Sequence, residues 1–300
     1  MSAYLGELLA FLSALFFACS NIFVAKGAVG GKGDRGAMLS VVITIGVSAV
    51  LWLVVEGGGI GAASPDWWAG IAWFALAGLC ATALGRAFLF VSIRRLGVTR
   101  ASAVKRLNPF FSVILAVVIL GEAATGLALA GMAMIGIAFA ILIRDAMARS
   151  GEGLEAPPAD YAWGVASALS YAFSYIARKN GLIAIAAPAF GTLVSAIAGL
   201  GVFALAGIFS SHYRDAFRNI FRYANRWLVA AGFLISFGQV SLFAALTYAP
   251  ISSVVMISSL EIFLATFLSV IVFRTEERPN VGTIFAAALA TFGVVAIAAG

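Results

Sequence analysis

The chain of 300 residues is 63% hydrophobic and only 11% charged. Soluble domains hold about 45–50% apolar and about 25% charged residues, so this composition excludes a globular protein with a surface suited to water. The formal net charge of +6 does not indicate nucleic-acid binding, because the cations fall in short turns between apolar runs rather than on one basic face. Since backbone amides find no water in a bilayer core, apolar runs of about 20 residues predict membrane-spanning α-helices.

Ten apolar runs of helix length follow one another when the chain is cut at glycines, prolines and charged clusters. They cover residues 4–25, 37–55, 68–91, 98–120 and 126–143 in the first half, and 161–177, 189–209, 227–246, 251–273 and 281–299 in the second. The run at 161–177 leaves open an extension past Ala177. Residues 146–159 form a polar linker near the midpoint. The first run lacks the basic start and clear cleavage site of a secretory peptide, so we expect it to remain as a span.

The two halves of the chain resemble each other at an offset of about 153 residues. Residues 85–90 align with 238–243, Gly97 aligns with Pro250, and Gly27 aligns with Gly181 at an offset one residue longer. We therefore predict one transmembrane domain over residues 1–300, with repeat 1 at about 1–145 and repeat 2 at about 160–300. Five spans per repeat is an odd number, so the second repeat enters the membrane from the opposite side and the two repeats are inverted.

The Lys and Arg residues of the turns agree with inverted repeats. They cluster after spans one and three (Lys26, Lys32, Arg35, Arg94, Arg95, Arg100) and after spans seven and nine (Arg214, Arg218, Arg222, Arg226, Arg274, Arg278), with Arg178 and Lys179 as exceptions. These turns share one side of the predicted bundle. The positive-inside rule makes that side cytoplasmic and places both termini outside the cell.

A repeated motif connects the chain to a known family. Leu107, Asn108 and Pro109, followed by an apolar run and then Gly121 and Glu122, resemble the signature of the EamA family of the drug/metabolite transporter (DMT) superfamily. The second copy begins at Leu260 and Glu261 and ends at Glu276, with Ile262 where the family often has proline. Residues 258–261 together with 274–279 are most similar to the aromatic amino acid exporters of YddG type.

This resemblance implies an all-α membrane protein with ten helices around a central cavity. It further implies export of aromatic or other neutral amino acids, or similar small metabolites, across the bacterial inner membrane by alternating access. Export of drugs or other metabolites, a channel and a non-transporting assembly partner are the alternatives. The expected partners are a small-molecule substrate and the lipid bilayer, without nucleic acid, and the chain is compatible with a monomer.

Charged residues at bilayer depth are the first candidates for a substrate site, because each costs about 2.5–3.5 kcal/mol to insert. They are Arg86 in span three, Lys105 and Arg106 in span four, and Glu261 near the centre of span nine. A zwitterionic amino acid needs an acceptor for its ammonium group and donors for its carboxylate, which these residues offer. The alternative is a purely structural ion pair between Glu261 and Lys105 or Arg106 that locks spans four and nine together; the two cations could also extend to the interface.

Uncharged polar and aromatic residues complete the candidate site. Asn21, Asn108 and Gln239 either bind substrate or hydrogen-bond between helices, and Gln239 occupies the repeat position of Arg86. Trp163, Tyr171 and Tyr175 recur at spacings that approach one face of span six, where they form a pocket wall unless Trp163 belongs to an interfacial belt. Tyr248 precedes Pro250 at the turn before span nine and is a candidate gate.

Catalytic, metal and cofactor sites are not expected. His212 lies in a predicted turn, and no two acidic residues lie within one helical turn inside a span. Cys19 and Cys80 lie within apolar runs without the spacing of metal ligands, so we expect packing roles for both.

Overall fold

The structure, a computed structural model, describes residues 4–27, 33–60, 67–123, 125–150, 157–222, 224–271 and 281–299. All regular elements in these ranges are helical. They are α1 (Leu5–Gly27), α2 (Gly33–Val55), α3 (Trp67–Gly78), the π-helical turn η1 (Leu79–Leu84), α4 (Gly85–Leu96), α5 (Val98–Lys105), α6 (Asn108–Leu120), α7 (Gly126–Ser150), α8 (Pro158–Ala184), α9 (Pro188–Phe209), α10 (Ser211–Arg218), α11 (Arg226–Tyr248), α12 (Ile251–Ser258), α13 (Glu261–Ile271) and α14 (Val281–Ala299).

These elements reproduce the predicted spans. The third span comprises α3, η1 and α4, the fourth comprises α5 and α6, and the ninth comprises α12 and α13. The short helix α10 was not predicted and joins spans seven and eight, with Arg214 and Arg218 on the surface. Lys32, Arg274, Glu276, Arg278, residues 272–273 of span nine and residues 151–156 of the linker lie outside the described residues. Residues 146–150 of the predicted linker belong to α7 instead.

Nine segments of the described chain are long and apolar enough to cross a membrane. The tenth predicted span lies in α8, whose 27 residues include Asp160, Arg178 and Lys179. These charged residues lower its hydropathy, but α8 is long enough to cross a bilayer and packs within the bundle against α3, α4 and α6. We therefore count ten spans.

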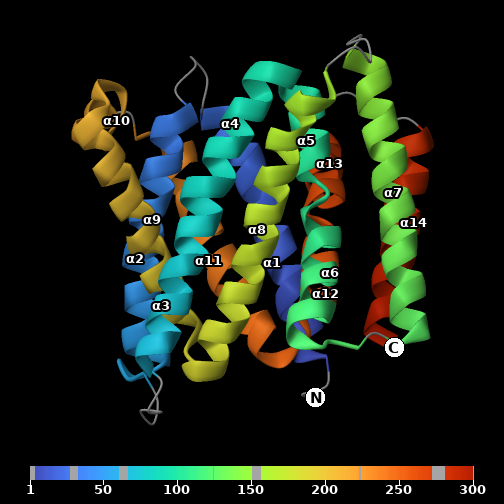
Figure 1. Ribbon diagram of the computed structural model, residues 1–300, viewed down its shortest axis with the longest axis horizontal. Helices are drawn as coiled ribbons and strands as arrows, with labels where there is room; N and C mark the ends of the chain where they lie inside the picture. Colours follow the sequence, from blue (N-terminus) through green and yellow to red (C-terminus); the bar gives the residue numbers. More distant parts are fainter. Residues whose placement is uncertain are drawn as a thin grey trace.

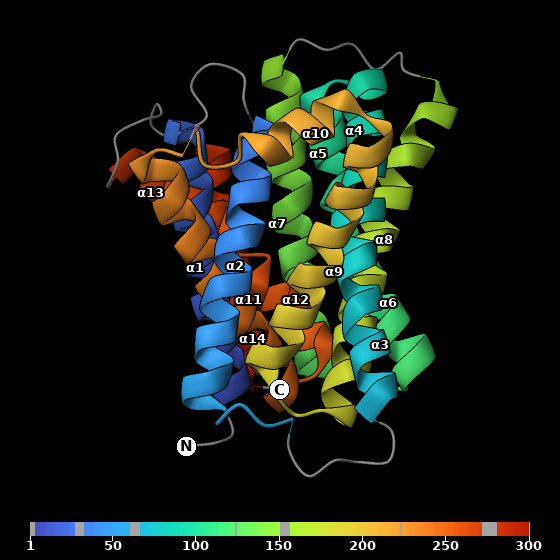
Figure 2. The same ribbon diagram turned by 90° about the vertical axis from the view of Figure 1, so that its left-hand side faces the viewer.

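The two halves of the bundle run in opposite directions. Figures 1 and 2 show α1 starting at the end of the bundle that holds both termini, whereas α8 starts at the other end. Helix packing follows the same symmetry, since α1 packs on α11 as α8 packs on α3 and α4. At these contacts Ser13 donates to the carbonyl oxygen of Gly238 at 2.8 Å, and its repeat equivalent Ser167 donates to that of Gly85 at 2.7 Å. The inverted five-helix repeat is confirmed.

Spans four and nine are each interrupted at the same repeat position. The half-helices α5 and α12 both have 8 residues and are followed by a two-residue turn. The next half-helices then begin at Asn108 and at Glu261. Pro109 lacks the N–H group that would continue the first helix, but Ile262 at the equivalent position has one. A proline is therefore not required for the break in span nine.

Candidate substrate-binding cavity

A polar cavity lies at the centre of the bundle and consists of two adjoining chambers. Chamber 1 has a volume of about 280 Å³ and is lined mainly by α2, α8, α9, α11 and the third span. Chamber 2 has a volume of about 330 Å³ and is lined mainly by α1 and by the interrupted spans four and nine. Five residues line both chambers: Phe17, Lys105, Asn108, Tyr175 and Glu261.

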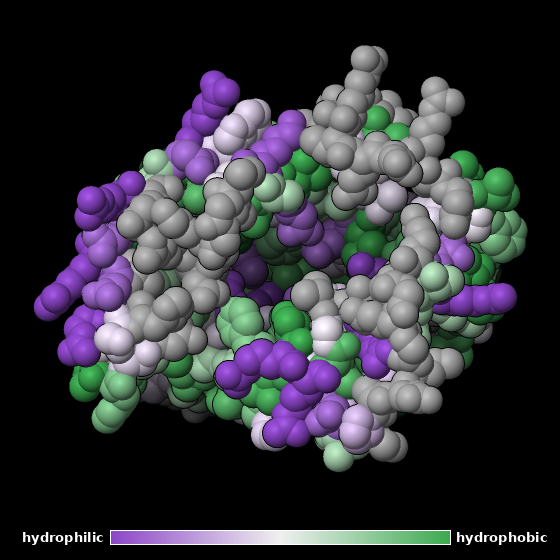
Figure 3. Space-filling view, turned by 90° about the horizontal axis from the view of Figure 1, so that it is seen from above, coloured by the Kyte–Doolittle hydropathy of each residue, from purple (hydrophilic) through white to green (hydrophobic). Residues whose placement is uncertain are grey.

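The basic end of the bundle, defined by Lys26, Arg94, Arg95, Arg214 and Arg218, is hollowed near its centre. Polar side chains lie in the depth of this hollow (Figure 3). The opposite end, which holds both termini, is called the closed end here. The cavity in this structure therefore faces the basic end.

Three sets of hydrogen bonds tie the closed end together. The Glu122 carboxylate accepts from the backbone N–H groups of Ile251, at 2.7 Å, and Ser252, at 3.1 Å, at the start of α12. Glu56 caps the start of α9 in the same way, through Ala189 and Phe190. Carboxylates are favourable at helix N-termini because they accept from unpaired N–H groups and interact with the helix dipole.

The third set comes from Lys179, whose Nζ donates to the carbonyl oxygens of Leu246, at 2.6 Å, and Ala249, at 3.2 Å. On the cavity side of these bonds lie the buried rings of Phe74 and Phe243, whose centroids are 5.9 Å apart. Apolar packing and hydrogen bonds together separate the cavity from this end of the bundle.

Eight of the ten predicted site residues line the cavity. They are Asn21, Arg86, Lys105, Asn108, Tyr171, Tyr175, Gln239 and Glu261. The equivalent positions Arg86 and Gln239 both line chamber 1, and the equivalent positions Asn108 and Glu261 line both chambers. The inverted repeat therefore brings matching positions of the two halves to one central space.

Trp163 and Tyr248 do not line either chamber. The Trp163 ring packs against Phe88 with centroids 5.8 Å apart, and the Arg95 guanidinium lies 5.7 Å from its centroid. Eight residues of helix separate Trp163 from Tyr171 by about 12 Å along the axis, which carries Trp163 out of the cavity to the basic end. Tyr248 is the last residue of α11, and 59% of its surface is exposed beyond the closed end of the cavity.

Glu261 shares the cavity with cations but is not locked to one. Its carboxylate interacts electrostatically with Lys105 and Arg106 and hydrogen-bonds with the side chain of Asn21. Among the described residues, no ion pair within 4.0 Å joins Glu261 to Lys105 or Arg106. The Lys105 Nζ lies instead 4.8 Å from the centroid of the Tyr171 ring. The alternative of a structural ion pair between spans four and nine is therefore not realised in this conformation.

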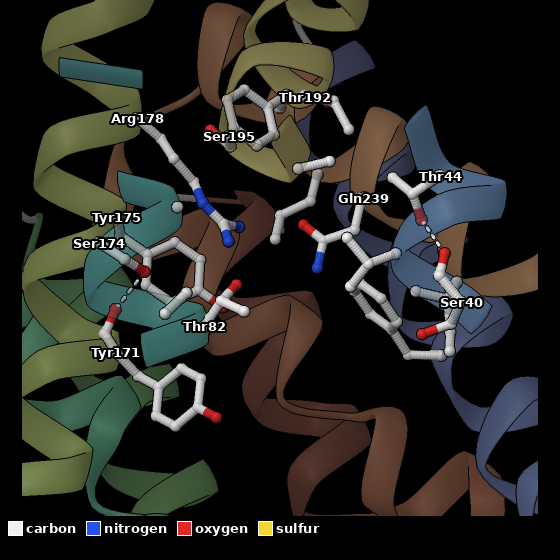
Figure 4. Close-up of a pocket in the computed structure, with 18 of the residues that line it drawn as sticks. Ser40, Thr44, Thr82, Tyr171, Ser174, Tyr175, Arg178, Thr192, Ser195 and Gln239 are labelled. Atoms are coloured by element: carbon white, nitrogen blue, oxygen red, sulfur yellow. Dashed lines mark hydrogen bonds between the residues drawn. The ribbon is translucent and has the colours of Figure 1, made fainter. Parts of the chain in front are cut away.

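Arg178 is the main cavity residue that the sequence did not reveal. Only 7% of its surface is exposed, and Figure 4 shows its guanidinium pointing into chamber 1. The group lies 5.3 Å from the centroid of the Tyr175 ring and 5.0 Å from that of Phe243. The predicted span six was bounded at Ala177 with an extension left open, and α8 does continue to Ala184. The alignment of Gly181 with Gly27 was a signal that this span continues.

Small hydroxyl side chains add polar surface that sequence analysis did not single out. They come from spans two, three, six and seven: Ser40, Thr44, Thr82, Ser174, Thr192 and Ser195. Several donate to carbonyl groups, as Thr192 does to Pro188 at 2.9 Å and Ser195 does to Phe74 at 2.7 Å. Such residues are compatible with apolar helices because backbone carbonyls satisfy their hydroxyl groups. Spans two and seven therefore line the cavity in addition to the spans that carry charges.

Ten membrane spans in two inverted repeats around a polar cavity define the architecture of a membrane transporter. The profile of the EamA-like transporter family matches residues 4–144 and 160–299, and the chain belongs to this family. A solved crystal structure is similar over 97% of this chain and 95% of its own, with a TM-score of 0.73 and 17% sequence identity. It is one of 29 solved chains that match in fold. No curated protein matches the sequence.

Proposed function

We propose that this chain is a secondary transporter that exports amino acids or similar small metabolites across the bacterial inner membrane by alternating access. The observation that carries the proposal is a polar cavity that faces one end of the bundle and is sealed at the other. If the basic end is cytoplasmic, as the positive-inside rule indicates, this conformation loads substrate from the cytoplasm. Rearrangement at the closed end then releases the substrate outside the cell.

The cavity supplies the groups that an amino acid requires. Glu261 is the acceptor for the ammonium group, since it is the acidic residue that lines both chambers. The cationic side chains of Arg86, Lys105 and Arg178, which line chamber 1, are donors for the carboxylate. The rings of Phe17, Tyr171 and Tyr175 provide apolar walls for the side chain.

Aromatic substrates are one option within this class, because flat rings pack against tyrosine and phenylalanine faces. Drug-like molecules or other metabolites are the second candidate, since the same aromatic walls would receive them. A channel is less compatible with the buried packing of Phe74, Phe243 and Leu246 at the closed end. Exchange of internal for external substrate across the membrane distinguishes a carrier from a channel.

Counterflow in liposomes tests the proposal. Purified protein is reconstituted into liposomes loaded with one unlabelled amino acid, and uptake of the same labelled amino acid is followed for a panel of amino acids. A carrier gives saturable uptake that depends on the internal substrate. Unsaturable flux that does not depend on internal substrate contradicts alternating access, and the absence of flux for all amino acids contradicts the proposed substrate class.

A further inference from the structure

The charges that line the cavity are strongly unequal. Among the described residues, the charged side chains that line the two chambers are Arg86, Lys105, Arg106, Arg178 and Glu261. Four of these are cationic and one is acidic. A neutral zwitterion would leave this excess of positive charge without a counter-charge inside the membrane, where unpaired charges are costly.

Arg178 concentrates this excess in chamber 1. Its contacts are the faces of the Tyr175 and Phe243 rings, and its Nε atom has no hydrogen-bond partner in the described structure. A guanidinium offers five N–H donors in a planar fork and cannot lose its charge as a lysine can. Among the described residues, this buried guanidinium has no acid partner within 4.0 Å and is held in place by two rings. It is therefore preorganised to bind an anionic ligand in two-point fashion.

The surroundings of Arg178 fit an oxyanion. Figure 4 shows the amide of Gln239 pointing into the same space from the opposite wall, with the Thr82 side chain nearby. Thr192 and Ser195 also line this chamber. Glu261 is the acidic residue that lines chamber 1, and it lies at the boundary with chamber 2. There it hydrogen-bonds with Asn21 and interacts electrostatically with Lys105 and Arg106. Chamber 1 therefore keeps its positive charge even when Glu261 is ionised.

We propose that chamber 1 is an anion subsite centred on Arg178 and that the substrate is an amino acid or related metabolite with a second anionic group, a carboxylate or a phosphate. This inference rests on the proposed transport function and narrows its substrate class from amino acids and similar metabolites in general to molecules with a net negative charge. The ammonium group lies at Glu261, the α-carboxylate lies against Lys105 or Arg86, and the second anionic group binds Arg178.

Matched ligand pairs that differ in one charge test the inference. Glutamate with glutamine tests a carboxylate, and O-phosphoserine with serine tests a phosphate. Binding is measured as the ligand-dependent rise in melting temperature of the purified protein, and counterflow is measured in parallel. We expect the anionic member of at least one pair to bind about tenfold or more tightly than its neutral partner, the gain of a charge-assisted hydrogen bond. The pair that shows the preference identifies the second group.

The variant Arg178→Gln should bring that preference to within about twofold. Arg178→Lys keeps the positive charge but lacks the planar fork of N–H donors, so it should retain part of the preference for the anionic ligand. Arg94→Gln is the control, because Arg94 is exposed at the basic end and does not line either chamber. If Arg178→Gln fails to fold, the preference of the wild-type protein and of Arg178→Lys for the anionic ligand still tests the inference.

Equal or tighter binding of the neutral members by wild-type protein overturns the inference and leaves the proposed transport function intact. Failure of every anionic member to bind also overturns it. Exchange of neutral amino acids separates these results from a failure of the proposed function, in which no amino acid is exchanged at all.

Discussion

Asn108 and Glu261 are the first residues of α6 and α13 and occupy the same position in the two inverted repeats. Both line both chambers, so the break in each interrupted span faces the cavity. Half-helix N-termini at the bilayer midplane are common substrate sites in transporters with inverted repeats. The two positions differ in charge, which gives the symmetric fold an asymmetric site. The Oδ1 atom of Asn108 has no hydrogen-bond partner in the described structure and is available to a ligand.

Glu261→Gln should fold but lose transport. Because no ion pair fixes Glu261 to Lys105 or Arg106, removing its charge should change the melting temperature little, whereas an ammonium group loses its acceptor. We expect the affinity for an amino acid to fall about tenfold or more, the value of a hydrogen bond to a charged group. Thermal melting and liposome counterflow measure the two effects.

The double variants of Glu261→Gln with Lys105→Met and with Arg106→Met provide the control. If Glu261 acts only as a structural counter-charge, the single variant should be strongly destabilised and a double variant should restore both stability and uptake. Wild-type uptake by a well-folded Glu261→Gln protein would rule out the role in ammonium binding.

Glu122→Gln should weaken the closed end. Its carboxylate accepts from two backbone N–H groups and from the Ser252 hydroxyl, and a neutral amide replaces only part of these bonds. The expected cost is about 1–3 kcal/mol, seen as a lower melting temperature. Asp160→Asn makes the same chemical change in the pair with Arg95, which is 51% exposed, and should cost at most about 1 kcal/mol. Equal melting temperatures for the two variants would contradict the role of Glu122 as a cap.

Gly131→Ala should destabilise the contact between α7 and α14. A Cβ atom at Gly131 would overlap the carbonyl oxygen of Gly293, and the backbone cannot move as a flexible side chain can. Overpacking of this kind costs about 1–3 kcal/mol. Gly126→Ala in the same helix is the matched control, since nothing lies within 4 Å of its Cβ position. Melting temperatures that fall by the same amount in both variants would argue against a close crossing of the two helices.

Single cysteines at the two ends of the bundle test the orientation in the membrane. In a background with Cys19 and Cys80 replaced, Ser211→Cys reports the basic end and Gly59→Cys reports the closed end, because both positions are exposed. The positive-inside rule predicts that an impermeant thiol reagent added to intact cells labels Gly59→Cys and spares Ser211→Cys. The reverse pattern would invert the predicted orientation, place both termini in the cytoplasm and turn the cavity outward.

The sequence predicted the spans closely because a bilayer demands apolar runs of helix length, and the repeat then placed equivalent residues at one central space. It did not predict the break in span nine, since Ile262 carries no local signal for one. Arg178 was missed because a charge near the end of an apolar run normally ends the span. Here α8 continues past Arg178, and the guanidinium points into the cavity. Trp163 was assigned from spacing along one helix face, but spacing does not specify depth in the membrane.

Access to the cavity from each end of the bundle tests alternating access most directly. Ile235→Cys, which lines chamber 1, is placed in the background without native cysteines and reconstituted in liposomes of known orientation. Without substrate, an impermeant thiol reagent should modify it from the basic end only, and substrate should raise modification from the closed end. Equal modification from both ends without substrate, or none from the closed end under any condition, would contradict alternating access.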